Sequence, residues 1–255
     1  MSTTTTLGKN AQAPVLGSGE LDRINVSLGD RSYDILVCKN ELKDFGKILR
    51  TNGLSDDIMV FTSPRIGKLY FNQLHQSLRH GGFIRVIRHD IPDGEKNKNW
   101  EQYTKCLNAL MENFPESGAI PTVINLGGGV VGDIGGFAAG TFRRGVPYIQ
   151  VPTTLLGDVD CGIGGKVGIN FNGVKNIIGM FYQPMLVFSD LSFLKTLAPR
   201  EIRSGVAEVI KYGAICSPQL FKYLEDNIEK LVSLDSDVLL HVVKTCYRIK
   251  AEVVK

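Results

Sequence analysis

The chain has 255 residues, of which 43% are hydrophobic and 22% charged, a composition typical of a globular protein with a substantial core. Its net charge of +3 is too small to indicate a nucleic-acid or membrane partner, although it suits an anionic small molecule. The five cysteines form no C-x-x-C pair, which excludes a thiolate zinc knuckle and favours a reducing compartment.

Residues 1–20 are polar and lack the apolar core of a secretory signal, so we predict a disordered tail. No apolar run approaches the roughly 20 residues that span a bilayer. Together these features predict a cytoplasmic protein, with an organelle such as a plastid left open as an alternative.

Short apolar runs bounded by turn residues follow the tail, and such runs are typical of strands. We predict a hairpin whose two strands are 24–28 and 33–37. Single strands are predicted at 57–61, 83–87, 121–126, 148–151 and 186–188. Residues 97–113 carry apolar side chains at helical spacing. Strands that alternate with helices predict an α/β domain with a mainly parallel sheet over 21–198.

Beyond residue 198 the pattern is helical only. Helices are predicted at 199–212, 220–232 and 238–255, which indicates the beginning of an all-helical domain over 199–255. The last helix reaches the final residue without a capping signal, and this is typical of a fragment.

Glycines follow the strand at 121–126. Gly127, Gly129 and Gly132 satisfy G-x-G-x-x-G, a spacing that lets backbone and helix N-terminus approach a phosphate, although a tight structural turn would use the same residues. Asp133 is expected in the first turn of the following helix, where it could also pair with the helix dipole. Pro152-Thr153-Thr154 stands where an ordinary dinucleotide fold has its acidic ribose ligand.

Charged residues among glycines are concentrated between residues 142 and 184. Lys166 follows Gly164-Gly165 and is predicted to face a phosphate from a loop, the alternative being a solvated lysine. Glu208 and Lys211 share one helix face in apolar surroundings, as a surface ion pair or as groups facing a site.

In order and spacing, these segments resemble 3-dehydroquinate synthases. The resemblance rests on residues 127–133, 144–145, 151–156, 159–160, 163–168, 175–176, 182–184 and 205–213. It implies a Rossmann-like NAD-binding α/β domain, a helical domain, an active site between them, and a homodimer. The implied reaction converts 3-deoxy-D-arabino-heptulosonate 7-phosphate to 3-dehydroquinate and phosphate in the shikimate pathway, with catalytic NAD and a Zn²⁺ or Co²⁺ ion.

The resemblance also implies roles for single residues. Those matching NAD contacts are Glu95, Lys98, Gly128, Gly129, Val130, Asp133, Thr153, Thr154, Lys175, Thr196 and Leu197. Those matching substrate and catalytic residues are Asp160, Lys166, Asn176, Lys211, Lys250 and Arg144, the last reaching the neighbouring subunit's substrate. Glu208 matches a metal ligand.

The chain departs from the family pattern in three places. Thr62-Ser63 replaces an acidic ribose contact, and Cys161-Gly162 replaces a pair of serines. His75, His80, His89 and His241 match neither histidine ligand of the metal. The remaining ligands are therefore expected beyond residue 255, and the chain is expected to be inactive alone.

Three other functions remain open. Another sugar-phosphate cyclase, of the epi-valiolone or deoxy-inosose type, would share most of the motifs. A metal-dependent polyol dehydrogenase would share the glycine loop, and an NAD-binding module without turnover is the alternative outside the enzymes.

Overall fold

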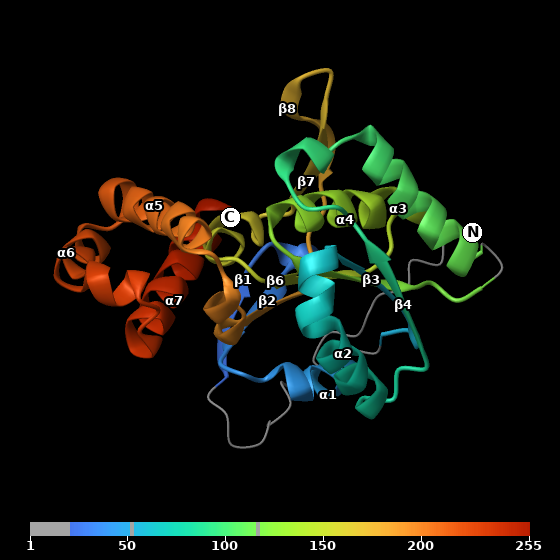
Figure 1. Cartoon of the computed structure of the whole chain (residues 1–255), viewed down its shortest axis with the longest axis horizontal. Coiled ribbons are helices and arrows are strands. Elements are labelled where there is room, and N and C mark those ends of the chain that lie inside the picture. The colour runs from blue at the N-terminus through green and yellow to red at the C-terminus, as the bar shows by residue number, and fades with distance from the viewer. Residues whose placement is uncertain (1–20, 52–53, 116–117) are drawn as a thin grey trace.

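The computed structural model describes residues 21–51, 54–115 and 118–255, so the predicted tail lies outside the described residues. The chain forms a seven-stranded sheet (Figure 1). Its hydrogen-bonded neighbours follow the order β1-β2-β9-β6-β5-β3-β4. Its strands are β1 Asp22–Val26, β2 Tyr33–Cys38, β3 Asp57–Thr62, β4 Arg85–Asp90, β5 Thr122–Gly127, β6 Tyr148–Pro152 and β9 Leu186–Asp190. β1 is antiparallel to β2 and the other neighbours are parallel, as the alternation of elements predicts.

The first face of the sheet is covered by two helices. α1 (Phe45–Arg50) and α2 (Pro64–His80) pack on alternate residues of the strands, among them Ile58, Val60 and Phe188. The strands are largely apolar because side chains on both faces are buried.

The second face is divided between two groups of helices. α3 (Trp100–Asn113) and α4 (Gly129–Thr141) cover the β3-β5 end, where they bury Phe61 and Val123. Three later helices cover the β1-β2-β9 end, where they bury Val37. Two separate hydrophobic cores therefore lie on one face, and the boundary between them falls over the middle of the sheet.

The middle of the sheet is also its narrowest junction. β6 pairs with β9 only through Ile149↔Leu186 and Gln150↔Val187. The π-helical segment η5 (Gly157–Cys161) follows β6 and fits beside the diverging strand ends, where Asp158 accepts a hydrogen bond from Ser189.

The helical part consists of α5 (Pro199–Cys216), α6 (Pro218–Val232) and α7 (Ser236–Val253), so all three predicted helices are present. α5 and α6 begin with proline, which lacks the amide hydrogen that a first turn leaves unpaired. The Asp235 side chain caps α7 by accepting from the amide of Val238 at 3.1 Å. Within the described residues no helix is both long and apolar enough to cross a membrane.

The charged segment after Gly165 is a hairpin, and the prediction of loops there is wrong. β7 (Lys166–Phe171) and β8 (Val174–Phe181) form a separate two-stranded sheet that projects beside α4 (Figure 1). Asn172 and Gly173 turn the chain with φ of 47° and 79°, the left-handed conformation that Asn-Gly favours.

Smaller elements differ from the predictions as well. β4 begins at Arg85, two residues after the predicted start, and the 17-residue α2 has no counterpart among the predicted elements. Short 3-10 turns complete the chain: η1 Gly29–Arg31, η2 Leu42–Asp44, η3 Glu95–Asn97, η4 Phe142–Arg144 and η6 Leu191–Thr196.

Candidate active site

A pocket of 440 Å³ opens where the two groups of helices approach each other. Its walls come from the residues after η3, from α4, η5, the β7-β8 hairpin and α7. Six residues predicted for the site line it: Lys98, Asp133, Asp160, Lys166, Asn176 and Lys250. Side chains from five segments that are distant in sequence therefore meet in one cavity.

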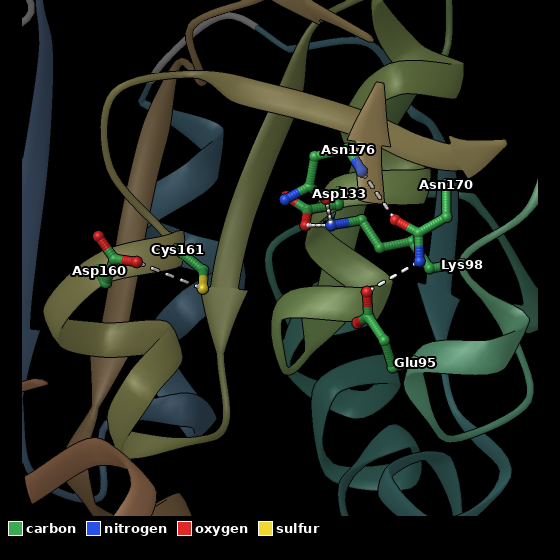
Figure 2. Close-up of polar contacts among 7 residues, drawn as sticks. All are labelled: Glu95, Lys98, Asp133, Asp160, Cys161, Asn170 and Asn176. Atoms are coloured by element: carbon green, nitrogen blue, oxygen red, sulfur yellow. Dashed lines mark hydrogen bonds and ion pairs between the residues drawn. The ribbon is translucent and has the colours of Figure 1, made fainter. Parts of the chain in front are cut away.

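The first wall centres on a buried lysine. Lys98 Nζ pairs with the Asp133 carboxylate and donates a hydrogen bond to Asn176 Oδ1 (Figure 2). The Lys98 and Asp133 side chains are only 6% and 18% exposed. Burial raises the pKa of Asp133 to about 6, although Lys98 opposes the shift.

Asp133 also corrects a prediction. It is the fifth residue of α4 and therefore lies past the first helical turn. Its charge is balanced by Lys98 rather than by the helix N-terminus.

The second wall carries a more open pair. Lys250 Nζ of α7 lies 2.5 Å from Asp160 Oδ1 of η5, and the two side chains are 18% and 33% exposed. Cys161 lies beside Asp160 at the pocket (Figure 2). Burial and then the Asp160 charge raise the pKa of its thiol to about 12, so the sulfur is protonated at neutral pH.

Glu208 and Lys211 of α5 form an ion pair near this second wall. The Glu208 hydrogen bond, and to a lesser extent the Asp160 charge, raise the pKa of Lys211. Nearby, the Tyr212 hydroxyl is buried and has no hydrogen-bond partner among the described residues. Neither Glu208 nor Lys211 lines the pocket itself.

A metal ion would find too few ligands in this part of the molecule. Among the described residues no three His, Cys, Asp or Glu side chains are grouped as a metal site requires. Glu208 could contribute one carboxylate, so these residues do not by themselves form a catalytic metal centre.

Lys166 lies at the pocket, but not on a loop. It is the first residue of β7, directly after Gly164 and Gly165, whose φ values are 92° and 64°. A Cβ on Gly165 would lie 2.7 Å from the carbonyl oxygen of Tyr182, so glycine lets β7 start close to the end of β8. Lys166 therefore lines the pocket from the start of a strand, and the predicted loop is wrong.

The glycine turn, residues 127–130, is not among the segments that line the pocket. Gly127 ends β5, and Gly128 precedes the first turn of α4, which contains Gly129 and Val130. A Cβ on Gly128 would lie 3.1 Å from Thr154 Cγ2, and one on Gly129 would lie 3.3 Å from Cys161 Sγ. Gly128 has no side chain to cap α4, so the first-turn amides are available to an anion.

The two threonines after β6 differ from each other. Thr154 Oγ1 accepts a hydrogen bond from the amide of Gly157 at 3.0 Å. The Thr153 hydroxyl is buried and has no partner among the described residues, which is costly unless a ligand supplies one.

Five predicted residues lie away from this pocket. Glu95 of η3 accepts a hydrogen bond from Asn170, and Lys175 is exposed on β8. Thr196 shares a 2.6 Å hydrogen bond with Tyr70, and the Leu197 side chain packs on the helical core. Arg144 is neither buried nor at the pocket, and its φ is 65°.

Sequence reasoning missed two polar residues next to the pocket. Asn170 of β7 contacts both Glu95 and the backbone amide of Asn176. Asp158 of η5 is fully enclosed and accepts hydrogen bonds from Ser189 at 2.7 Å and Tyr247 at 3.2 Å. Burial raises the pKa of Asp158 to about 8. The signals were an asparagine two residues before Asn-Gly and a second aspartate beside Asp160.

Comparison with known proteins identifies the family. The model of the 3-dehydroquinate synthase N-terminal domain matches residues 88–204, and that of the C-terminal domain matches residues 205–255. The 3-dehydroquinate synthase of Geotalea uraniireducens (strain Rf4) is 43% identical over 92% of this chain and 64% of its own length. That of Desulforamulus reducens is 42% identical over 91% of this chain and 64% of its own length. The chain thus spans a little under two thirds of these relatives.

Solved structures give the same fold. The 2-epi-5-epi-valiolone synthase ValA from Streptomyces hygroscopicus subsp. jinggangensis 5008, with NAD⁺ and Zn²⁺ bound, is 31% identical, with a TM-score of 0.77 over 89% of this chain and 62% of that one. A 2-deoxy-scyllo-inosose synthase complexed with carbaglucose-6-phosphate, NAD⁺ and Co²⁺ is 22% identical and shows the fold alone, with a TM-score of 0.80 over 91% of this chain and 63% of that one. On its sequence and on the six predicted side chains in its pocket, this chain belongs to the 3-dehydroquinate synthase family.

Proposed function

We propose that the protein acts as a 3-dehydroquinate synthase, which converts 3-deoxy-D-arabino-heptulosonate 7-phosphate to 3-dehydroquinate and phosphate with catalytic NAD and a divalent metal. The observation that carries the proposal is the pocket with Lys98, Lys166 and Lys250 around two carboxylates. Identity of 42–43% to 3-dehydroquinate synthases, against 31% to the valiolone synthase, favours this member of the superfamily.

NAD is proposed to bind along the glycine turn. The free first-turn amides of α4 suit its diphosphate, and the Thr153 hydroxyl would gain the partner that it lacks. Bound NAD supplies the removal and return of a hydride at one ring carbon. Asp133 lies one turn further along α4 from these amides, and its ion pair with Lys98 lines the pocket.

The sugar phosphate is proposed to bind between the two walls. Lys166, Lys250 and Asn176 offer donors to its phosphate and carboxylate, and these interactions are strong because the pocket is partly desolvated. Asp133, with a pKa of about 6, is placed to hold or accept a proton near neutral pH, and Asp160 lies in the same pocket beside Lys250.

Glu208 is proposed as one metal ligand, with the others supplied from outside the described residues. Arg144 is proposed to reach the substrate of a partner subunit in a homodimer, because it does not line the pocket of its own chain. We also propose a cytoplasmic location, as expected for an enzyme of small soluble metabolites.

The second candidate is another sugar-phosphate cyclase. The structural likeness to the valiolone synthase favours it, since 31% identity extends over 89% of this chain. The two candidates differ in substrate: the synthase acts on a sugar acid phosphate, whereas the sugar phosphate of the other cyclases lacks the carboxylate that a second cationic group would bind.

The test separates cofactor binding from turnover. NAD is titrated calorimetrically into the 255-residue chain. Phosphate release is then assayed in the presence of Zn²⁺, with the acid phosphate as substrate in one assay and glucose 6-phosphate in the other. The full-length Geotalea uraniireducens relative serves as the positive control. We expect NAD binding without turnover by this chain, because its described residues bring no three metal-ligating side chains together. Absence of NAD binding would refute the proposed function, and turnover at the relative's rate would refute the proposed need for further ligands.

A further inference from the structure

The hairpin beside the pocket contains an irregularity at its functional residues. Ile169 pairs with Ile178 and Phe171 with Val174, so the β8 segment 175–177 lies opposite the single residue Asn170. Within this bulge Asn176 adopts a left-handed backbone with φ of 53°. Bulges redirect a side chain and leave ladder groups unpaired, which need another partner.

Asn170 supplies that partner. Its Oδ1 accepts a hydrogen bond from the Asn176 backbone amide at 2.8 Å, and its own backbone amide donates to the Lys98 carbonyl oxygen at 2.8 Å. Lys98 Nζ in turn donates to Asn176 Oδ1. Three residues, from the C-terminal side of η3, from β7 and from β8, thus form a closed ring of hydrogen bonds, much of which is visible in Figure 2.

The other end of the Asn170 side-chain amide leaves the ring. Nδ2 donates to Glu95 Oε1 at 2.9 Å (Figure 2). The Asn170 side chain therefore joins Glu95, matched to the cofactor, to Asn176, matched to the substrate, while its backbone amide holds Lys98. Each end of the amide has a different role, because Oδ1 can only accept and Nδ2 can only donate.

We propose that Asn170 is a positioning residue, which holds Asn176 in its left-handed conformation and couples it to Lys98 and Glu95. Asn170 is absent from the residues lining the pocket, so it acts on a ligand only through these neighbours. The inference rests on the proposed function for the identity of the ligand, but the hydrogen-bonded ring can be tested without any ligand.

The first test removes the side-chain amide. In Asn170→Ala we expect the exchange rate of the Asn176 amide hydrogen, followed by NMR, to rise about tenfold, because its acceptor is gone. Calorimetry with NAD as the probe should show a Kd that is roughly three- to tenfold higher, since Glu95 loses a hydrogen bond and Asn176, the partner of Lys98 Nζ, loses its restraint. The matched control is Asn172→Gly in the same hairpin, where glycine keeps the positive φ and the ring is untouched.

The second test reverses the polarity of the outer hydrogen bond. Asn170→Asp keeps an acceptor for the Asn176 amide but sets two carboxylates against each other at Glu95. Adding Glu95→Gln restores a donor opposite the introduced carboxylate and leaves the net charge as in the wild type. Because Glu95 is itself matched to the cofactor, Glu95→Gln alone is the reference for the double variant. We expect Asn170→Asp to raise the Kd for NAD less when Glu95→Gln is present than when it is absent.

The outcomes separate this inference from the proposed function. If Asn170→Ala leaves Asn176 exchange within about twofold of the wild type, or if Asn170→Asp raises the Kd for NAD as much with Glu95→Gln present as without it, the positioning role is wrong. If the wild type itself fails to bind NAD, the proposed function fails, while the exchange measurement still decides whether Asn170 holds Asn176.

Discussion

The two walls of the pocket contain the same chemistry in different surroundings. Lys98 and Asp133 form a pair enclosed by α4 and the hairpin, whereas Lys250 and Asp160 form one that is more open to solvent at α7 and η5. A buried ion pair contributes little net stability when intact but costs a great deal when one partner is lost. For a more exposed pair, the loss of stability on removing one partner is smaller, because water screens the charge that remains. The first wall is therefore the rigid one, and the second can adjust to a ligand.

The largest expected effect is loss of the buried cation. Lys98→Met leaves Asp133 enclosed with no counter-charge, so its pKa rises further and the free energy of unfolding falls by about 3 kcal/mol near neutral pH. Urea denaturation measures the change. Adding Asp133→Asn should recover more than half of it, and a double variant as unstable as the single one would contradict this account of the wall.

The next effect lies beneath the second wall. Asp158 has its pKa raised to about 8 from 3.8, so between these values the folded protein binds one more proton than the unfolded chain. Its contribution therefore makes the free energy of unfolding fall as pH rises through this window, by up to about 1.4 kcal/mol per pH unit. Asp158→Asn should flatten the profile measured by urea denaturation across this window. An unchanged slope would show that Asp158 is ionised in the folded state.

A smaller change in stability is expected at the open pair. Lys250→Met leaves Asp160 with access to water, so the free energy of unfolding should fall by at most about 1 kcal/mol. Binding of NAD should stay within about twofold, because the glycine turn proposed to bind it does not line the pocket in which Lys250 lies. If Lys250→Met destabilises the protein as much as Lys98→Met, the two walls do not differ as described.

The smallest effect tests the unpaired hydroxyl. Thr153→Val has nearly the same shape and removes a buried donor that has no described partner, so stability without ligand should change by less than about 1 kcal/mol. The Kd for NAD should rise about three- to tenfold if the hydroxyl contacts the cofactor. Thermal unfolding with and without NAD measures both quantities, and an equal shift by NAD in both proteins would exclude the contact.

Much of the sheet could be predicted because its strands are buried on both faces. Apolar runs such as 57–61 and 121–126 are short and bounded by turn residues, which favours strands. The observed β3 and β5 each differ from these predicted ranges by at most one residue at either end. The helical part followed from periodicity alone. α2 was missed because its buried residues are sparse, among them Leu74 and Leu78, so a mostly polar segment conceals its one apolar stripe.

The candidate site was predicted by residue type, and its internal pairing was not. Charged residues near glycines indicated Lys166, but the hairpin depended on Asn172-Gly173, a local turn signal in a segment interpreted as loop. Partners such as Lys98 with Asp133 are 35 positions apart in the chain, a separation that no periodicity reports. Burial, which sets the pKa values of Asp133 and Asp158, follows only from the packed fold.

The two residue pairs that join β6 to β9 have a mechanical consequence. A sheet flexes most easily where the fewest ladder hydrogen bonds connect neighbouring strands. On one face this junction separates two hydrophobic cores, and on the other a single core beneath α1 and α2 continues across it. A ligand that contacts both walls of the pocket therefore links the two sides of the β6–β9 junction. We expect ligand binding to raise the free energy needed to separate β6 from β9, rather than to tighten the packing within either half of the sheet.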